Sequence, residues 1–496
     1  MTDAYCKLEA RFARLSRYAH LGAMAGWDQL TLMPSGGSEA RAAAIAELQV
    51  LMHESLTDDA TRGLLDDVDP STLDDTQRAN LREMKREVDD ARVLPPSLVE
   101  AQSLAGARGE RAWRRCRADN DWQGFLEPFR EVVRLAREEA TIRAEAAGCS
   151  RYEALLQKFE PGMSVAELDR LFADMRQWLP GLLQEVVEHQ RATVDYTTPR
   201  GPFPQQDQQR LGQRMMDWLG FDFEHGRLDV SLHPFCGGVP EDVRLTTRYR
   251  EDECFSSLMG IIHETGHARY EQNLPAALRG QPAGKARSMA VHESQSLSFE
   301  MQLGRSAAFL RCLRPWLVEQ FGDQPAFEAD NLVRLAQRVE PGLIRVDADE
   351  VSYPAHILLR YDIERALIEG DIEVEEIPGL WDEGMQRLLG LDTRGNYRDG
   401  CLQDIHWTDG AFGYFPTYSL GAMLAAQLMA AARRERPDLD ERIAAGDLKP
   451  LFYWLKTNVW QQGSLYDTDE LIRRASGESL NPAHYRRHLR TRYLGE

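Results

Sequence analysis

The sequence predicts a mainly α-helical protein that carries one small antiparallel β-sheet. Apolar residues recur at helical spacing through most of the chain, helix-capping residues stand where those patterns begin and end, and strand-like alternation is confined to one region. The 496 residues are 43% hydrophobic and 28% charged, so the chain has apolar side chains for a large core and enough charge to stay soluble.

Three segments carry the clearest helical signals. An alanine-rich stretch follows Ser38 and predicts one helix. Residues 121–147 predict a second, which Gly148 ends because glycine readily adopts the left-handed conformation found after helix C-termini. Ser164 and Glu167 form a capping box for a third. Behind that box the apolar residues lie three and four positions apart: Leu168, Leu171, Phe172, Met175, Trp178 and Leu179.

A single region has the period of a β-strand. It follows a predicted loop over residues 199–204, and it contains two runs in which apolar and polar residues alternate. The members on the apolar side are Leu228, Val230 and Leu232, then Val243, Leu245, Thr247 and Tyr249. The glycine-rich segment Cys236–Pro240 lies between the runs, so the pattern predicts strand, turn and strand.

Charge and composition exclude several classes of function. The formal net charge is −20, from 79 acidic and 59 basic residues, which disfavours nucleic acid or an anionic membrane as a partner because like charges repel. The longest apolar run, Leu420–Ala432, is too short to span a bilayer. The N-terminus lacks the features of a signal peptide, and the seven cysteines are widely spaced without a CxxC pair. We therefore expect a cytoplasmic protein with reduced thiols.

The segment His263-Glu264-Thr265-Gly266-His267 is the strongest functional signal. Residues four positions apart share one face of a helix, so His263 and His267 can bind the same metal ion. Glu264 lies close enough to reach a water on that ion without being a ligand. Zinc suits two imidazoles and a carboxylate, and it tolerates an open fourth position. The pattern predicts the catalytic zinc site of a metallopeptidase.

The third ligand has to come from outside this helix. Tyr270 and Asn273 stand where the metzincin pattern requires glycine and histidine, which excludes that class. A second predicted helix, over residues 286–305, carries Glu293 and Glu300. We favour Glu293 as the ligand and expect Glu300 to be a solvated surface residue.

Together these motifs resemble the Taq-type metallocarboxypeptidases of the gluzincin group. The resemblance extends from about residue 27 to residue 421 and covers nearly the whole chain. Besides the HETGH segment, the residues that carry it are Trp27-Asp28-Gln29, Met33-Pro34, His233-Pro234-Phe235, Asp242-Val243-Arg244-Leu245-Thr246, His292-Glu293-Ser294-Gln295-Ser296, Ile344-Arg345-Val346-Asp347-Ala348-Asp349 and Gly400-Cys401-Leu402-Gln403-Asp404-Ile405-His406-Trp407.

The resemblance implies a large helical gluzincin body with a deep active-site groove. It implies one metallocarboxypeptidase domain over residues 1–496, with N-terminal helices to about 220, the metal site and groove over about 221–430, and C-terminal helices over 431–496. It also implies a homodimer with one divalent ion per subunit, zinc or else cobalt. The implied activity is removal of single C-terminal residues from peptides with broad specificity, proline being disfavoured.

Within that family mechanism, His263, His267 and Glu293 hold the ion while Glu264 acts as the general base. In similar gluzincins a histidine and a tyrosine from a C-terminal segment stabilise the oxyanion. The candidates in this chain are His406, Tyr414 and Tyr418. A structural role in the hydrophobic core would explain His406 equally well. Of the two tyrosines we favour Tyr418.

A carboxypeptidase must also bind the free carboxylate of its substrate, for which arginine offers a bidentate fork. Arg345 is the first candidate, although an ion pair with Asp347, Asp349 or Glu350 would explain it equally well. Arg244 is the second, with a pair to Asp242 as its structural alternative.

Two histidines and one strand are further candidates for contact with the substrate. His233 belongs to the HPF segment. His292 supports Glu293, packs beside it, or donates to an amide of the substrate. The strand that carries Asp242, Arg244 and Thr246 could pair with the substrate backbone as an added strand.

Two other functions compete with a carboxypeptidase. One is an oligopeptidase or dipeptidyl carboxypeptidase on the same scaffold. The other is a non-catalytic helical binding protein with a structural metal, against which Glu264 counts because a structural site does not need a base.

Overall fold

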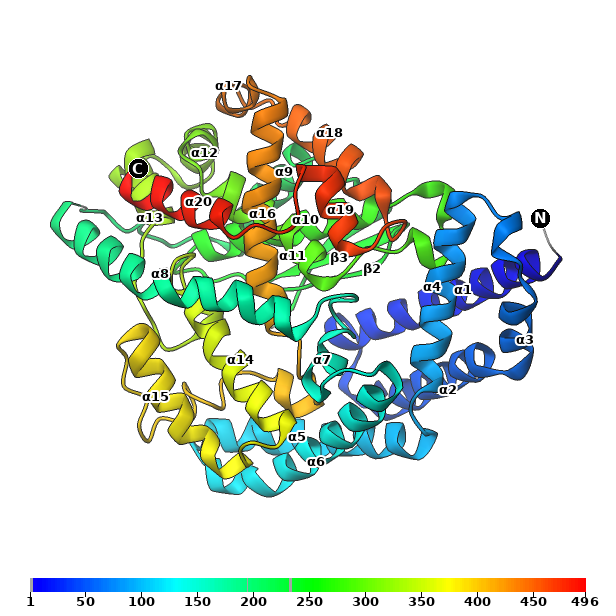
Figure 1. Cartoon of the computed structure of the whole chain (residues 1–496). Helices are drawn as coiled ribbons and strands as arrows, with labels where there is room; N and C mark the ends of the chain where they lie inside the picture. The colour runs from blue at the N-terminus through cyan, green and yellow to red at the C-terminus, as the bar shows by residue number, and fades with distance from the viewer. Residues whose placement is uncertain (1–2, 194, 232–233) are drawn as a thin grey trace.

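The computed structural model describes residues 3–193, 195–231 and 234–496, and it is mainly helical with one small sheet (Figure 1). The predicted fold class is therefore confirmed. The helices before the sheet are α1 Asp3–Thr31, α2 Ser38–Thr57, α3 Asp59–Asp67, α4 Asp75–Arg92, α5 Pro96–Ala118, α6 Trp122–Ala147, α7 Arg151–Leu156, α8 Val165–Thr193 and α9 Gln205–Trp218.

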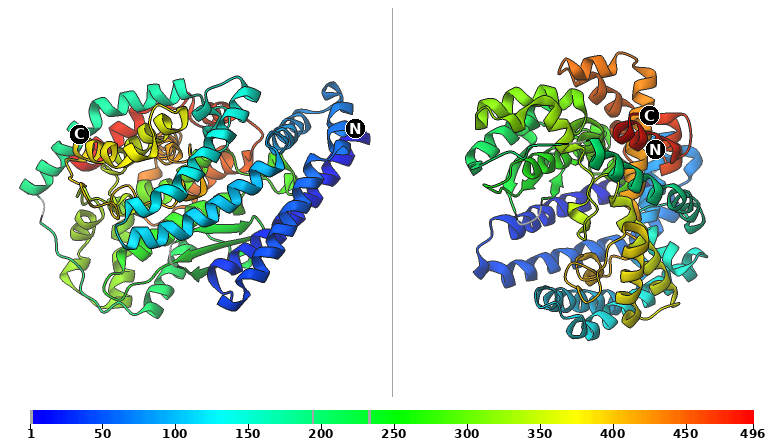
Figure 2. Two further views of the ribbon diagram at one scale, coloured as in Figure 1. Left: turned by 90° about the horizontal axis from the view of Figure 1, so that it is seen from below. Right: turned by 90° about the vertical axis from the view of Figure 1, so that its left-hand side faces the viewer.

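The three helices predicted from capping signals are α2, α6 and α8. Gly148 follows α6 in the left-handed conformation, with φ 68°, and its amide closes the helix on the Ala144 carbonyl. At the start of α8 the Glu167 amide donates to the Ser164 hydroxyl at 3.1 Å, as a helix N-cap requires. α1 and α2 lie side by side as a long hairpin at one end of the molecule (Figure 2).

The sheet has three strands, β1 Gly226–Val230, β2 Cys236–Val239 and β3 Asp242–Thr247, in the order β1-β3-β2. β2 and β3 form an antiparallel hairpin, whereas β1 pairs with β3 in parallel. The small sheet was predicted correctly, but its purely antiparallel pairing was wrong. Most of the segment expected to be a turn is itself β2, and only Pro240 and Glu241 form the turn between Val239 and Asp242. Gly238 adopts φ 96°, and a Cβ atom there would collide with the Asp242 carbonyl oxygen. Leu232, assigned to the first run, lies outside the described residues.

The second half of the chain packs around the sheet and around α16, which crosses the upper centre of Figure 1. Its elements are α10 Phe255–Gln272, α11 Met289–Leu297, a π-helix η6 Ser298–Gly304, α12 Ala307–Phe321, α13 Ala329–Ala336, a short 3₁₀ turn η8 Arg345–Asp347, α14 Tyr353–Glu369, α15 Ile377–Leu389, α16 Pro416–Glu435, α17 Leu439–Ala444, α18 Lys449–Asn458, α19 Thr468–Ser476 and α20 Ala483–Leu494.

α16 joins the two largest hydrophobic cores. Leu420 and Met423 pack into one core with α6, α8 and α14, while Leu424 and Leu428 pack into the other with α10, α12 and α18. This explains the apolar run noticed in the sequence: a helix that is buried on nearly every side is apolar around its whole circumference. None of the helices in the described part of the chain is long and apolar enough to cross a membrane.

Candidate active site

Two neighbouring helices bring the three predicted metal ligands together. His263 and His267 lie one turn apart on α10, and Glu293 faces them from α11. The Glu293 Oε2 atom lies 3.9 Å from His263 Nε2 and 3.5 Å from His267 Nε2. Ligand atoms around a tetrahedral zinc ion are about 3.3–3.6 Å apart, given metal–ligand bonds of roughly 2.0–2.2 Å. The three side chains therefore fit one small divalent cation, and their donor set leaves a coordination position open.

Two glycines allow α11 to lie this close to its neighbours. A Cβ atom on Gly266 of α10 would stand 2.6 Å from the Gln295 carbonyl oxygen and from the Ser296 Cα atom. A Cβ atom on Gly421 of α16 would stand 2.7 Å from the Cβ and Cγ atoms of Glu293. α11 is thus held between α10 and α16 at backbone contact distance, and this spacing sets the position of Glu293.

Gly266→Ala is expected to lower the free energy of unfolding by about 1–3 kcal/mol, because the added methyl group forces α10 and α11 apart. It should also weaken metal binding, since Glu293 moves with α11. Gly260→Ala is the matched control on the same helix, where a Cβ atom would meet only Pro234 Cγ, at 3.9 Å. Denaturant unfolding and metal titration of both variants check this; equal effects of the two substitutions would contradict it.

The Nδ1 atoms of His263 and His267 contact different groups. His263 Nδ1 lies 3.0 Å from Glu300 Oε2, and Arg305 donates to the other oxygen of Glu300 at 2.7 Å. Glu300 is 9% exposed and sits on the π-helix η6. The expectation that Glu300 is a solvated surface residue was therefore wrong, because its carboxylate orients a predicted metal ligand instead.

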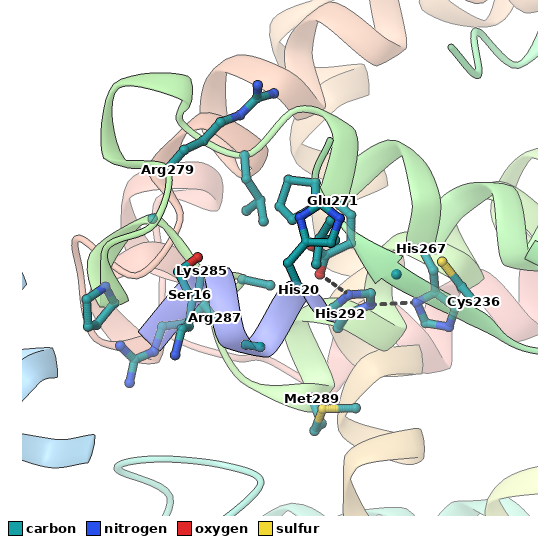
Figure 3. Close-up of a pocket in the computed structure, with 18 of the residues that line it drawn as sticks. Ser16, His20, Cys236, His267, Glu271, Arg279, Lys285, Arg287, Met289 and His292 are labelled. Carbon is teal, nitrogen blue, oxygen red and sulfur yellow. Dashed lines mark hydrogen bonds and ion pairs between the residues drawn. The ribbon is translucent and has the colours of Figure 1, made fainter. Parts of the chain in front are cut away.

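His267 is held by a second histidine (Figure 3). Its Nδ1 atom lies 2.7 Å from His292 Nδ1, and His292 Nε2 lies 2.9 Å from Glu271 Oε1. The His292 side chain thus links His267 to Glu271, and it lines the large cavity together with Glu293. Glu271 was missed in the sequence, yet it continues the helical face of His263 and His267 at the same spacing of four residues.

The electrostatics of the cluster favour a bound cation. Among the protein groups alone, burial lowers the pKa of His263, but Glu293, Glu300 and Glu264 more than offset this and raise it to about 10. Burial lowers the pKa of the neighbouring His267 to about 4. A buried imidazole that keeps its proton at neutral pH does so because carboxylates surround it, and a divalent cation can replace that proton.

Glu264 is 7% exposed and faces the same space as the three ligand atoms. Burial raises its pKa to about 7, with a smaller contribution from Glu293. A carboxyl group with a pKa near neutrality is suited to both accepting and donating a proton.

The predicted ligands lie where two cavities meet. One cavity, of about 840 Å³, runs toward α1, α2 and the edge of the sheet, and the other, of about 580 Å³, runs toward η8 and α14. His263, Glu264, Glu293 and Tyr418 line both. A peptide lying across this junction would place one of its bonds at the metal ligands.

Tyr418 lies in the first turn of α16, and Tyr414 lies just before it. Both line the large cavity, and only Tyr418 also lines the smaller one. His406 stands behind Tyr418, with its Nε2 atom 3.3 Å from the tyrosine hydroxyl, and burial lowers its pKa to about 4. The structure therefore brings Tyr418 to the ligands and places a neutral His406 where it can orient that hydroxyl.

Arg345 lines the smaller cavity and is 5% exposed. Its guanidinium donates to one oxygen of Asp404 at 2.9 and 2.8 Å and to the Tyr353 hydroxyl at 2.7 Å. Arg360, which is fully buried, donates to the other oxygen of Asp404 at 2.7 Å. The partners expected for Arg345 (Asp347, Asp349 and Glu350) were therefore wrong. Asp404 was overlooked although it belongs to the QDIHW segment, because nothing local connects it to Arg345.

The pairing of β3 with a substrate strand needs correction, whereas Arg244 is found in a pair with Asp242. The Arg244 guanidinium forms a bidentate pair with Asp242, at 2.9 and 2.6 Å, which is the structural alternative foreseen for it. β3 is the central strand, so both of its edges are already hydrogen-bonded and cannot accept a substrate strand. The outer strands are β1 and β2, and Cys236, Gly238 and Val239 of β2 line the large cavity. His233 lies outside the described residues.

The chain is similar to known metallopeptidases along nearly its whole length. The family model described as "Carboxypeptidase Taq (M32) metallopeptidase" matches residues 7–493. Thermostable carboxypeptidase 1 of Thermus thermophilus is 37% identical over 97% of this chain and 97% of its own. Carboxypeptidase 1 of Bacillus subtilis is 34% identical over 97% of this chain and 96% of its own. The solved structure of Trypanosoma cruzi metallocarboxypeptidase 1 superposes with a TM-score of 0.98 at 51% identity, covering 99% of this chain and 100% of that one.

Proposed function

The chain belongs to the Carboxypeptidase Taq (M32) metallopeptidase family, and from that premise we propose that it removes single residues from free peptide C-termini with broad specificity, proline being disfavoured. The observation that carries the proposal is the convergence of two imidazoles, one carboxylate and a free Glu264 at the junction of two cavities. We propose His263, His267 and Glu293 as ligands of one divalent ion per subunit, zinc or else cobalt.

A divalent ion bound there would lower the pKa of a coordinated water and polarise the scissile carbonyl. The part we assign to Glu264 is proton transfer. Its carboxylate accepts a proton from the attacking water, and its carboxylic acid later donates that proton to the leaving amine. Its burial supports this role, because a raised pKa makes both transfers accessible near neutral pH.

The developing oxyanion needs hydrogen-bond donors in addition to the ion. We assign this role to Tyr418, because its side chain lines both cavities, and we give Tyr414 the part of a second donor on the large-cavity side. In this scheme His406 orients the Tyr418 hydroxyl.

The terminal carboxylate is assigned to Arg345. Arg345 and Arg360 share the single carboxylate of Asp404, which leaves one positive charge uncompensated within this trio. Glu364 compensates it only in part, because burial raises its pKa to about 7. A buried cluster with surplus positive charge at the wall of the smaller cavity attracts an anionic group. We accordingly place the C-terminal residue of the substrate in the smaller cavity.

Arg345→Gln is expected to lower kcat/KM for peptides with a free C-terminus by about 30- to 1,000-fold, since losing a buried charged partner costs roughly 2–4 kcal/mol. Peptides with an amidated C-terminus should be poor substrates of both the natural enzyme and the variant. Arg244→Gln is the control, because that arginine is already paired on the sheet.

Mass spectrometry of the products separates this proposal from its alternatives. Release of single residues supports a carboxypeptidase, whereas released dipeptides or internal fragments would indicate a dipeptidyl carboxypeptidase or an oligopeptidase. Equal cleavage of free and amidated peptides would refute the role of Arg345.

We also propose that the enzyme acts as a cytoplasmic homodimer on peptides, without a nucleic-acid or membrane partner. The family resemblance supports the dimer, and the net charge of −20 disfavours polyanionic partners.

A further inference from the structure

The smaller cavity carries two charged side chains that the mechanism does not use. Arg248 follows the end of β3, and Asp347 is the last residue of the 3₁₀ turn that begins with Arg345. Both side chains are exposed and both line the cavity. Within residues 3–193, 195–231 and 234–496, neither side chain has a hydrogen bond or an ion pair.

The other charged groups around this cavity are committed to partners or to the proposed metal site. Arg305 pairs with Glu300, and Arg345 pairs with Asp404. Glu350 accepts hydrogen bonds from His488 at 2.8 Å and from Arg492 at 3.1 Å, both on α20. The two uncommitted charges in the described lining, Arg248 and Asp347, therefore have opposite signs.

Their positions suit contact with the side chain of a bound C-terminal residue. Arg345 is buried in the cavity wall, whereas the next residue, Val346, is 69% exposed and Asp347 is exposed beyond it. Arg248 comes from the segment between β3 and α10, and Ser256 and Ser257 at the start of α10 line the same cavity. A residue whose carboxylate is held at Arg345 would direct its side chain toward the more exposed part of the cavity, where these two charges lie.

We propose that Arg248 and Asp347 determine which C-terminal side chains the enzyme prefers. Arg248 favours acidic residues, Asp347 favours basic residues, and the presence of both keeps either preference small. This inference rests on the proposed placement of the C-terminal residue in the smaller cavity. It gives a physical reason for broad specificity: a cavity with one charge of each sign discriminates weakly against any side chain.

The test uses three peptides that differ only in a C-terminal Glu, Gln or Lys. Arg248→Gln is expected to lower the ratio of kcat/KM for Glu over Gln by about two- to fivefold, the range for one exposed charge pair. Asp347→Asn is expected to lower the ratio for Lys over Gln by a similar factor. Arg248→Glu should make the peptide ending in Lys a better substrate than the peptide ending in Glu. High salt should reduce the ratios of the natural enzyme, because exposed charges are screened.

Arg227→Gln is the matched control, since Arg227 of β1 is also exposed but is already paired with Asp229. It should leave all ratios unchanged. If Arg248→Gln and Asp347→Asn leave them unchanged as well while single residues are still released, the inference is wrong and the proposed function stands. The variants could instead change how kcat/KM depends on the penultimate residue of the peptide. In that case the smaller cavity holds the residue on the N-terminal side of the scissile bond. That result would overturn both the inference and the role of Arg345.

Discussion

Replacing Glu264 with glutamine is expected to lower kcat by about 10²- to 10⁴-fold, the usual contribution of a general acid–base group. Glutamine has the size of glutamate but can neither accept the proton of the attacking water nor deliver it to the leaving amine. Because Glu264 is not one of the three converging ligand groups, the variant should keep its metal. Steady-state kinetics with metal analysis of the same samples measure both quantities.

Glu241→Gln is the control for this substitution. Glu241 also lines the large cavity, but it is exposed and pairs with Arg279 at 3.3 Å, so its loss should leave kcat unaltered. If Glu264→Gln retained full activity with its metal bound, the mechanism proposed above would be wrong. A variant that loses both metal and activity would also contradict it, because Glu264 would then be required for metal binding.

Removal of the metal is expected to abolish peptide hydrolysis and to lower stability. An ion that binds only the folded chain stabilises it by about 4 kcal/mol when the free ion is at 1,000 times its Kd. A strong chelator should therefore lower the thermal unfolding midpoint, and added zinc or cobalt should restore both stability and activity. The ion that restores activity at the lowest free concentration would identify the preferred metal.

Two substitutions test this prediction in steps, because one removes a proposed ligand and the other removes a group that contacts a ligand. Glu293→Gln removes a proposed ligand and should mimic chelation without a chelator. Glu300→Gln leaves all three proposed ligands in place and removes only the carboxylate that contacts His263 Nδ1. Metal affinity should therefore fall by about 10- to 100-fold. Equal metal affinity of Glu293→Gln and the natural enzyme would exclude Glu293 as a ligand.

The parts of the site that the sequence revealed are those fixed by local geometry. The spacing of His263 and His267 predicts a shared face because the α-helix has one pitch, and the ends of α6 and α8 follow from Gly148 and Ser164 in the same way. Glu293 could be predicted because it follows His267 by 26 positions, which is enough chain for the next helix to fold back against the first.

The parts that were missed depend on contacts between distant segments. The alternation of Leu228 and Val230 predicts a strand but contains no information on whether it pairs in parallel, which the path of the chain through β2 decides. Asp404 lies 59 positions from Arg345 along the chain, and in the fold the same carboxylate also accepts a hydrogen bond from Arg360 of α14. The charge pattern of a sequence shows which groups need partners, but not which partners they find.

The placement of α16 has a consequence for how the molecule melts. Its residues belong to both large cores, and Gly421 on the same helix lies against Glu293. Neither core can loosen without disturbing the helix that completes the other, so the two behave as one cooperative unit. In contrast, α2 contains no buried residue among those whose side chains are described, so its outer surface can fray without this penalty. We therefore expect local opening to begin at α2, whose Met52 and His53 line the large cavity.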